Sequence, residues 1–231
     1  MSLYASLLLL SIAIPFLLSF EKRMQYYRQW KYLMPAIVIT AIFYIVFDVY
    51  LTKAGVWGFN PRYHSNILIF HLPLEEWLFF ILIPYASIFL HDTIVLYLPK
   101  LCLTRRMARG ISVILIILLI IIIIFNTEKA YTVYVFSITA LALLISLWDK
   151  TGIPGFYYIT FLAILIPFTL VNSILTGSFI ESEVVWYNDV ENLGIRFLTI
   201  PLEDFFYGFS LILFSLLLRN KIRLLFGRQR S

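Results

Sequence analysis

The chain has 231 residues, of which 61% are hydrophobic and 13% are charged, and it carries a net charge of +5. Soluble domains are apolar at only about half of their positions, so this composition, with a mean hydropathy of +0.91, excludes an ordinary soluble domain. Cys102 is the single cysteine, which excludes an internal disulfide and a cysteine-based metal cluster. The sequence therefore predicts an integral membrane protein.

Seven apolar segments are long enough to cross the roughly 30 Å of hydrocarbon in a bilayer. In chain order they cover about 3–20, 32–51, 77–98, 111–125, 131–148, 156–176 and 195–218. The first segment lacks a basic flank and a small-residue cleavage site, which favours a retained helix over a signal peptide. We expect an all-α integral membrane fold with about seven transmembrane helices.

Lysine and arginine gather in alternate connections, namely those after the first, third and fifth segments, and in the tail. Short cytoplasmic loops collect such residues. This pattern predicts a multi-pass protein of the cell (inner) membrane, with its N-terminus outside and its C-terminus in the cytoplasm. A basic tail beside anionic lipid follows from that topology, so the lipid bilayer is an expected partner and nucleic acid is not.

A short acidic motif occurs twice in the chain. Pro-Leu-Glu-Glu at 73–76 returns as Pro-Leu-Glu-Asp at 201–204. Other polar and aromatic residues recur upstream in the same order: Asp48, Trp57 and Asn60 before the first motif, and Asn172, Trp186 and Asn188 before the second. The sequence therefore predicts an internal repeat of three helices.

The repeat divides the chain into four parts. We expect a first three-helix unit at 1–98, a connector with the fourth helix at 99–130, a second unit at 131–218 and a basic cytoplasmic tail at 219–231. A single extra crossing makes the two units parallel in the membrane, as in other parallel-repeat folds. Both acidic motifs then lie on the same outer side.

The paired acids Glu75, Glu76, Glu203 and Asp204 have two interpretations. Each proline suits the first turn of a helix, and acids there complement the helix dipole at the headgroup level without further function. The recurrence of both acids with a polar residue from the preceding helix favours a functional site. Neighbouring helical residues point about 100° apart, so one member of each pair can face the bundle. Close carboxylates do not readily both ionise, and a retained proton is what a general acid needs.

The two Pro-x-Glu-acid motifs, with Asp48 before the first and the segment 172–177 before the second, resemble the small membrane lycopene cyclase family. The resemblance covers nearly the whole chain and is to the fused, two-unit form. It implies a cofactor-independent, metal-free and redox-neutral cyclisation of membrane-embedded lycopene to a product with β-ionone rings. In that reaction an acid protonates the terminal double bond and a base removes a proton after ring closure.

Carried over by motif, the resemblance makes the four acids the candidates for acid and base, without an assignment within each pair. The supporting or substrate-binding candidates are Asp48 and Asn172, which would orient the acids, and Trp57, Trp186, Asn60 and Asn188. The number of rings formed and a homo-oligomeric state stay open.

Two alternatives remain open. One is a cyclase for another polyene, such as a C50 carotenoid, because motifs do not separate substrates that share an end group. The other is a proton-coupled transporter, since duplicated units and membrane acids are also found in transporters. An opsin-like protein would need a lysine in its last helix for a Schiff base, and the segment 195–218 has none.

Overall fold

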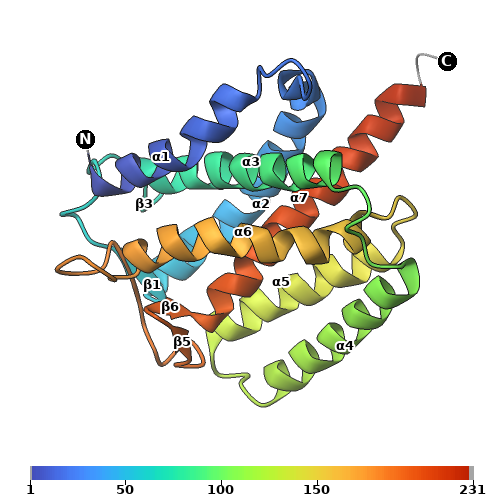
Figure 1. Ribbon diagram of the computed structural model, residues 1–231. Helices are drawn as coiled ribbons and strands as arrows, with labels where there is room; N and C mark the ends of the chain where they lie inside the picture. The colour runs from blue at the N-terminus through green and yellow to red at the C-terminus, as the bar shows by residue number, and fades with distance from the viewer. Residues whose placement is uncertain (1, 229–231) are drawn as a thin grey trace.

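A computed structural model describes residues 2–228, which form a bundle of helices (Figure 1). The helices are α1 (Leu3–Leu18), α2 (Trp30–Lys53), α3 (Leu74–Tyr97), α4 (Arg105–Ile124), α5 (Ala130–Leu147), α6 (Ile153–Leu175) and α7 (Leu202–Arg228), with the 3-10 turn η1 (Tyr26–Gln29) before α2. Five of these, α2 to α6, are long and apolar enough to cross a membrane. The prediction of an all-α membrane protein is confirmed.

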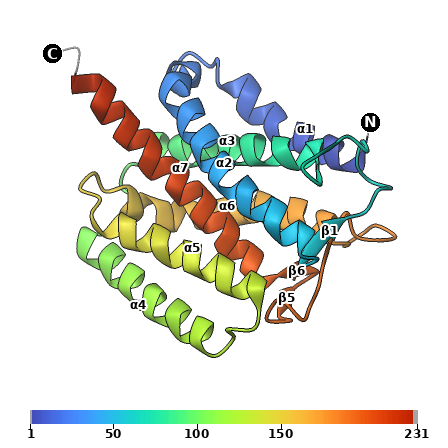
Figure 2. The same cartoon turned by 180° about the vertical axis from the view of Figure 1, so that it is seen from behind.

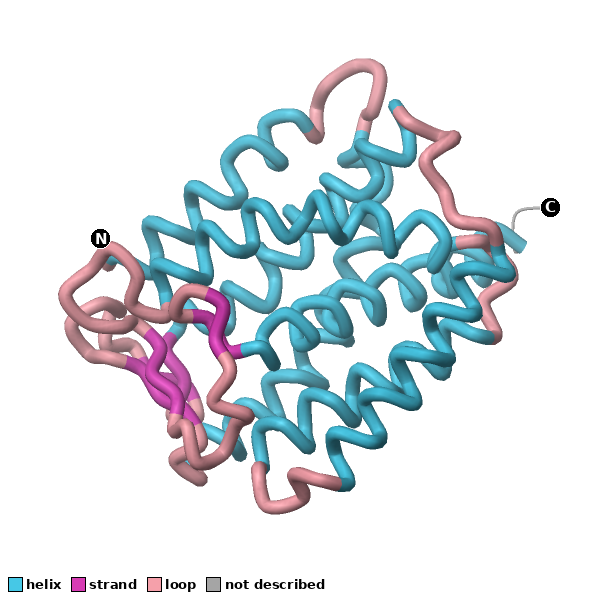
Figure 3. The backbone as a smooth tube through the Cα atoms, turned by 60° about the horizontal axis from the view of Figure 1, so that its bottom comes forward, coloured by secondary structure: helices cyan, strands magenta, loops and turns pink. Residues whose placement is uncertain are grey.

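The strands are short, and they lie at one end of the bundle together with the longest loops (Figure 3). They form three antiparallel pairs: β1 (Trp57–Phe59) with β4 (Val185–Tyr187), β2 (Leu68–Ile69) with β3 (Leu72–Pro73), and β5 (Arg196–Phe197) with β6 (Ile200–Pro201). The second and third pairs are hairpins that lead directly into α3 and α7. The first pair joins two loops that are far apart in the sequence.

Three predicted boundaries differ from the structure. The last helix begins at Leu202 rather than near 195, because 195–201 folds into the β5–β6 hairpin. Helix α4 begins at Arg105, where the Thr104 side chain caps it, so basic residues assigned to a loop are helical. Helix α7 continues to Arg228, so most of the predicted separate tail is helical as well. Residues 229–231, with Arg230, lie outside the described part of the chain.

Corresponding helices of the two predicted units make corresponding contacts. Helix α1 packs on α3, α5 packs in the same way on α7, and α2 lies against both α3 and α7. Helix α4 lies at the edge of the bundle beside α5 (Figures 1 and 2). The main apolar core is built largely from α2, α3, α5 and α7. The ends of α2 and α6 and the starts of α3 and α7 therefore meet near the strands, where both acidic motifs lie.

Candidate active site

Each acidic motif follows a tight hairpin. The strand residues Leu68 and Ile69 pair with Pro73 and Leu72, and the second hairpin repeats this register at 196–201. The amide of Leu74 donates to the carbonyl of Ile67 at 2.8 Å, and Leu202 does the same to Ile195 at 2.9 Å. Each proline thus stands just before the helix rather than in its first turn. The hairpin sets the direction in which the helix begins, and with it the faces taken by the two acids.

The first acid of each pair holds a loop and a neighbouring helix. Glu75 Oε1 accepts hydrogen bonds from Ser2 Oγ and the Ser65 amide, both at 2.7 Å, and Oε2 accepts one from Ser65 Oγ at 3.0 Å. Glu203 Oε1 accepts hydrogen bonds from Thr132 Oγ1 at 2.6 Å and the Leu193 amide at 2.8 Å. Both carboxylates therefore connect the start of the third helix of a unit to that unit's first helix and loop.

The second acid of each pair lines a shared cavity. Glu76 Oε2 accepts a hydrogen bond from the Tyr4 hydroxyl at 2.5 Å. Asp204 accepts two, from Tyr131 at 2.5 Å and from Tyr187 at 2.9 Å, one on each oxygen. Tyr4 and Tyr131 come from α1 and α5, the first helices of the two predicted units. The second acids of both motifs therefore meet in one place.

A third carboxyl group enters the same cavity from α2. Asp48 has no exposed surface. The Tyr207 hydroxyl donates to its Oδ1 at 2.7 Å, and its Oδ2 has no hydrogen-bond partner. The repeat partner of Asp48, Asn172, also lines the cavity, and its side-chain nitrogen donates to the Phe168 carbonyl at 3.1 Å. The bonds made by Asp48 and Asn172 go to these partners, not to the paired acids.

The cavity has a volume of about 60 Å³. Its remaining walls are largely apolar and aromatic, with Trp57, Phe59, Phe79 and Phe168 among them. Pockets that hold drug-sized ligands have volumes of roughly 300 Å³ or more, so a large end group enters only if lining side chains move.

Among residues 2–228, no group of three or more His, Cys, Asp or Glu side chains is placed to hold a metal ion.

Trp57 and Trp186 occupy different environments although they occur at similar points in the repeat. Trp57 is buried, donates from Nε1 to Thr52 Oγ1 at 2.6 Å, and meets Tyr131 edge-on with ring centroids 5.1 Å apart. Trp186 is 39% exposed and does not line the cavity; its ring covers Gly58 on the paired strand. Trp57 is thus part of the cavity wall, while Trp186 packs on the outside of the strand pair.

Asn60 and Asn188 hold the two loops together. The backbone N–H of Asn60 donates to the Val184 carbonyl, and the backbone N–H of Asn188 donates to the Val56 carbonyl, each at 2.9 Å. These reciprocal bonds flank the β1–β4 pair. Both asparagines lie outside the cavity lining, so the structure places them in the loop framework.

The contact between Gly58 and Trp186 in the β1–β4 pair can be tested by substitution. A Cβ atom added at Gly58 would lie 2.4 Å from the Trp186 ring. Gly58→Ala is expected to displace the tryptophan and lower the stability by about 1–3 kcal/mol, the usual effect of overpacking. Thermal unfolding in detergent micelles measures the change. Gly110→Ala is the control, because a Cβ at that position in α4 meets nothing within 4 Å, and alanine within a helix is expected to leave the melting temperature unchanged or raise it. A melting temperature that does not fall in Gly58→Ala would contradict the packing role of Trp186.

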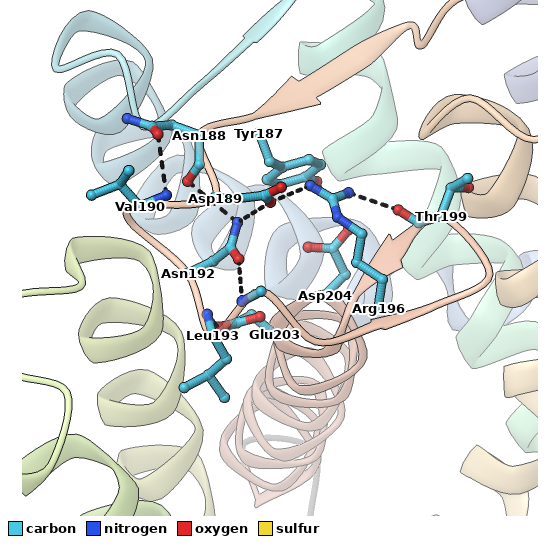
Figure 4. A network of polar contacts seen from close by, with 11 residues as sticks. Tyr187, Asn188, Asp189, Val190, Asn192, Leu193, Arg196, Thr199, Glu203 and Asp204 are labelled. Atoms are coloured by element: carbon cyan, nitrogen blue, oxygen red, sulfur yellow. Dashed lines mark hydrogen bonds and ion pairs between the residues drawn. The ribbon is translucent and has the colours of Figure 1, made fainter.

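A polar network supports the second acidic motif from the loop side (Figure 4). The Arg196 guanidinium donates to Asp189 Oδ1 at 2.5 Å and to the Thr199 carbonyl at 2.8 Å. The hydrogen bond from Arg196 lowers the pKa of the Asp189 carboxyl. Asn192 donates to Asp189 and accepts from the Gly194 amide at 2.7 Å. Hydrogen bonds among its own residues therefore hold together the loop between Tyr187 and the start of α7.

The hydrogen-bonding role of the tyrosines that hold the cavity acids was not predicted from the sequence. These tyrosines are four buried or partly buried residues: Tyr4, Tyr131, Tyr187 and Tyr207. Tyr4 and Tyr131 stand 72 and 73 residues before the acids they bond. Extending the repeat back to its first helix would have matched these two tyrosines, whereas Tyr187 and Tyr207 have no tyrosine at the matching position in the first unit.

Comparison with known proteins gives the following matches. A family model described as lycopene cyclase matches residues 1–94 and 128–222. A bifunctional lycopene cyclase/phytoene synthase from Phycomyces blakesleeanus is 36% identical over 63 residues, which cover 27% of this chain and 10% of that protein. The match therefore spans about a tenth of the length of this curated relative. No solved structure matches the chain.

Proposed function

Because the chain belongs to the lycopene cyclase family, we propose that it is a carotenoid end-group cyclase of the lycopene β-cyclase type. The proposed reaction is a proton-initiated, redox-neutral isomerisation that turns the linear ends of lycopene into β-ionone rings. The observation that carries this proposal is the meeting of three carboxyl groups, those of Asp48, Glu76 and Asp204, in one aromatic-lined cavity.

Carboxyl groups of this kind can supply both an acid and a base. Like charges around one poorly hydrated cavity repel one another, so the site favours retaining a proton beside an ionised carboxylate. The retained proton starts the reaction and the carboxylate ends it. The chemistry consumes no oxidant, reductant or cofactor, since atoms are only rearranged within the substrate.

The walls of the cavity suit a cationic intermediate. Aromatic faces attract a cation through their ring quadrupoles, and Trp57, Phe59 and Phe79 contribute such rings. Apolar side chains between the polar groups also limit the room for water beside the substrate, which protects the cation from being trapped by water before the ring closes. The apolar lining thus protects the intermediate while the tyrosines hold the acids in place.

We propose a single composite site rather than one site per unit. Glu76 comes from the first predicted unit and Asp204 from the second, and both line the same cavity. Each lycopene end would then enter in turn. Glu75 and Glu203 act as positioning residues in this proposal, because their hydrogen bonds hold loops and helices.

The proposed topology places the site at the outer side of the cell membrane. The motifs lie at the starts of α3 and α7, whereas Arg105 and Arg109 lie near the start of α4, which follows the far end of α3 in the chain, and Arg219 lies in the second half of α7. Basic residues favour the cytoplasmic side. The proposal includes the two-unit division at 1–98 and 131–218. It is supported by the hydrogen bonds of each acidic motif, which go to residues of the same proposed unit.

Expression in a lycopene-accumulating bacterial host, with pigment analysis by liquid chromatography, tests the proposal. The wild-type chain is expected to form cyclic carotenoid, and Glu76→Gln and Asp204→Asn each to leave only lycopene. A one-ring product retained in either single variant would indicate independent sites. Unchanged lycopene with well-expressed wild type would reject this substrate and favour another polyene or a transporter.

A further inference from the structure

The three carboxyl groups of the cavity differ in how many hydrogen bonds they accept. Asp204 accepts one from a tyrosine hydroxyl on each of its oxygens, and Glu76 accepts one from Tyr4. Asp48 accepts one on Oδ1, while its Oδ2 is buried and has no partner in the structure. Glu203 Oε2 is also buried without a partner, but Glu203 does not line the cavity. Asp48 is therefore the cavity carboxyl group with a buried oxygen that no side chain or backbone amide of the described residues reaches.

This difference separates a base from an acid. Hydrogen bonds donated to a carboxylate stabilise its charged form, and Asp204 receives two of them. A buried carboxylate oxygen without a donor is costly when charged, and a protonated, neutral Oδ2 lowers that cost. The resulting O–H is not held by an acceptor. Such a proton is free for transfer to a substrate atom.

The repeat is broken at the positions that create this difference. Asp48 is matched by Asn172 in the second unit, and Phe59 is matched by Tyr187, each pair lining the same cavity. The first unit thus carries the extra carboxyl group, and the second carries the extra hydroxyl donor. The asymmetry gives the shared cavity an acidic side and a basic side.

We infer that Asp48 is the catalytic acid of the site, with Asp204 as the base and Tyr207 as the residue that positions Asp48. The inference rests on the proposed cyclase function and assigns roles within it. It replaces the orienting role expected for Asp48 from the sequence.

The proton transfer balances within the substrate and the two side chains. The Asp48 Oδ2–H bond breaks, and the π electrons of the terminal double bond form the new C–H bond, leaving a tertiary cation. The π electrons of the neighbouring double bond close the six-membered ring and move the cation into it. Asp204 takes a proton from the adjacent ring carbon, and that C–H electron pair becomes the ring double bond. After product release the proton returns from Asp204 to Asp48 through the shared cavity.

Turnover of lycopene by the purified protein in lipid vesicles tests this assignment. Asp48→Asn is expected to lower turnover by about a hundred- to ten-thousand-fold, the range for loss of a general acid. The asparagine fits a fold that already has Asn172 at the matching position. Glu181→Gln is the control, because it also removes one carboxylate but lies on the surface, with its side chain 75% exposed.

A second variant separates chemistry from packing. If Asp48 supplies a proton, Asp48→Glu retains more activity than Asp48→Asn, because only glutamate keeps a carboxylic acid. If Asp48 only accepts the Tyr207 hydrogen bond, the isosteric asparagine retains more activity than the longer glutamate. Turnover that decreases from wild type to Asp48→Glu to Asp48→Asn supports the inference. Turnover that decreases from wild type to Asp48→Asn to Asp48→Glu overturns it. If Asp48→Asn does not fold, folded Asp48→Glu decides alone: turnover above about 1% of wild type, the upper end of the loss expected without an acid, supports the inference, and less overturns it.

Tyr207→Phe gives a further readout. Loss of one hydrogen bond to a charged or reacting carboxyl group is expected to lower turnover about ten- to a hundred-fold without abolishing it, and unchanged turnover would contradict the positioning role. A wild-type protein that does not cyclise lycopene would reject the proposed function itself. Active wild type together with Asp48→Asn within about tenfold of it, short of the loss expected for a general acid, would reject only the assignment of Asp48.

Discussion

Glu76→Gln is expected to lower turnover by about a hundredfold, because it removes one of the three cavity carboxyl groups among which the protons of the reaction are shared, while Glu75→Gln leaves it within about tenfold of wild type. The two residues are adjacent and the substitution is the same, so the comparison isolates the direction of the side chain. Glu76 lines the cavity beside Tyr4, whereas Glu75 bonds Ser2 and Ser65.

The expected effect of Glu75→Gln is on stability. A glutamine keeps a carbonyl oxygen for Ser2 and the Ser65 amide, but it loses the negative charge that strengthens both bonds. Hydrogen bonds to charged groups contribute about 1.5–3 kcal/mol and neutral ones about 0.5–1.5 kcal/mol, so a loss of about 1–2 kcal/mol is expected. Thermal unfolding and turnover per folded molecule, measured on the same purified samples, separate the two effects.

The second motif provides an independent comparison. Asp204→Asn is expected to behave as Glu76→Gln does, and Glu203→Gln as Glu75→Gln does, because Glu203 holds Thr132 and the Leu193 amide. Equal loss of turnover at both members of a pair, with normal stability, would show that the first acid also reaches the substrate. Such a result would overturn the division of roles between the paired acids.

The sequence predicts the helices well because each helix is a long apolar run. It predicts the neighbourhood of the acids because Pro-x-Glu-acid occurs twice. Which acid faces the cavity depends on the hairpins that precede α3 and α7, and their two-residue strands are too short to produce an alternating pattern. The stretch 195–201 is apolar enough to be read as helix, although it is a hairpin in the structure.

The residues that complete the site are harder to predict. Tyr4 and Tyr131 are two of 15 tyrosines in the chain, and only the packing of α1 on α3 and of α5 on α7 brings them to the acids. Trp57 and Trp186 give the same sequence signal, but one lines the cavity and the other covers Gly58. Their difference comes from the register of the β1–β4 pair, which joins residues more than a hundred positions apart.

Arg219→Met is expected to cause the largest loss of stability away from the site. Arg219 forms a two-pronged ion pair with Asp92, joining α7 to α3, and the two side chains are only 15% and 22% exposed. Removing one partner of a buried pair costs about 3–5 kcal/mol, since the other charge is left uncompensated. The residual exposure places the expected loss near the lower end, at about 3 kcal/mol.

The origin of that loss can be tested by a second substitution. If the unpaired charge of Asp92 causes it, Asp92→Asn in the Arg219→Met background is expected to recover most of the melting temperature. Arg62→Met is the matched control, because the Arg62–Glu181 pair has side chains 61% and 75% exposed, and exposed pairs contribute little. An equal loss in the single and double variants would indicate that the arginine stem, not its charge, packs the helix ends.

The position of this ion pair also separates stability from catalysis. Asp92 and Arg219 lie toward the ends of α3 and α7, far along each helix from the acids at their starts. Turnover per folded Arg219→Met molecule is therefore expected to match that of wild type, even as the melting temperature falls. A parallel loss of turnover in folded protein would mean that the relative position of α3 and α7 at this end controls how Glu76 and Asp204 meet in the cavity.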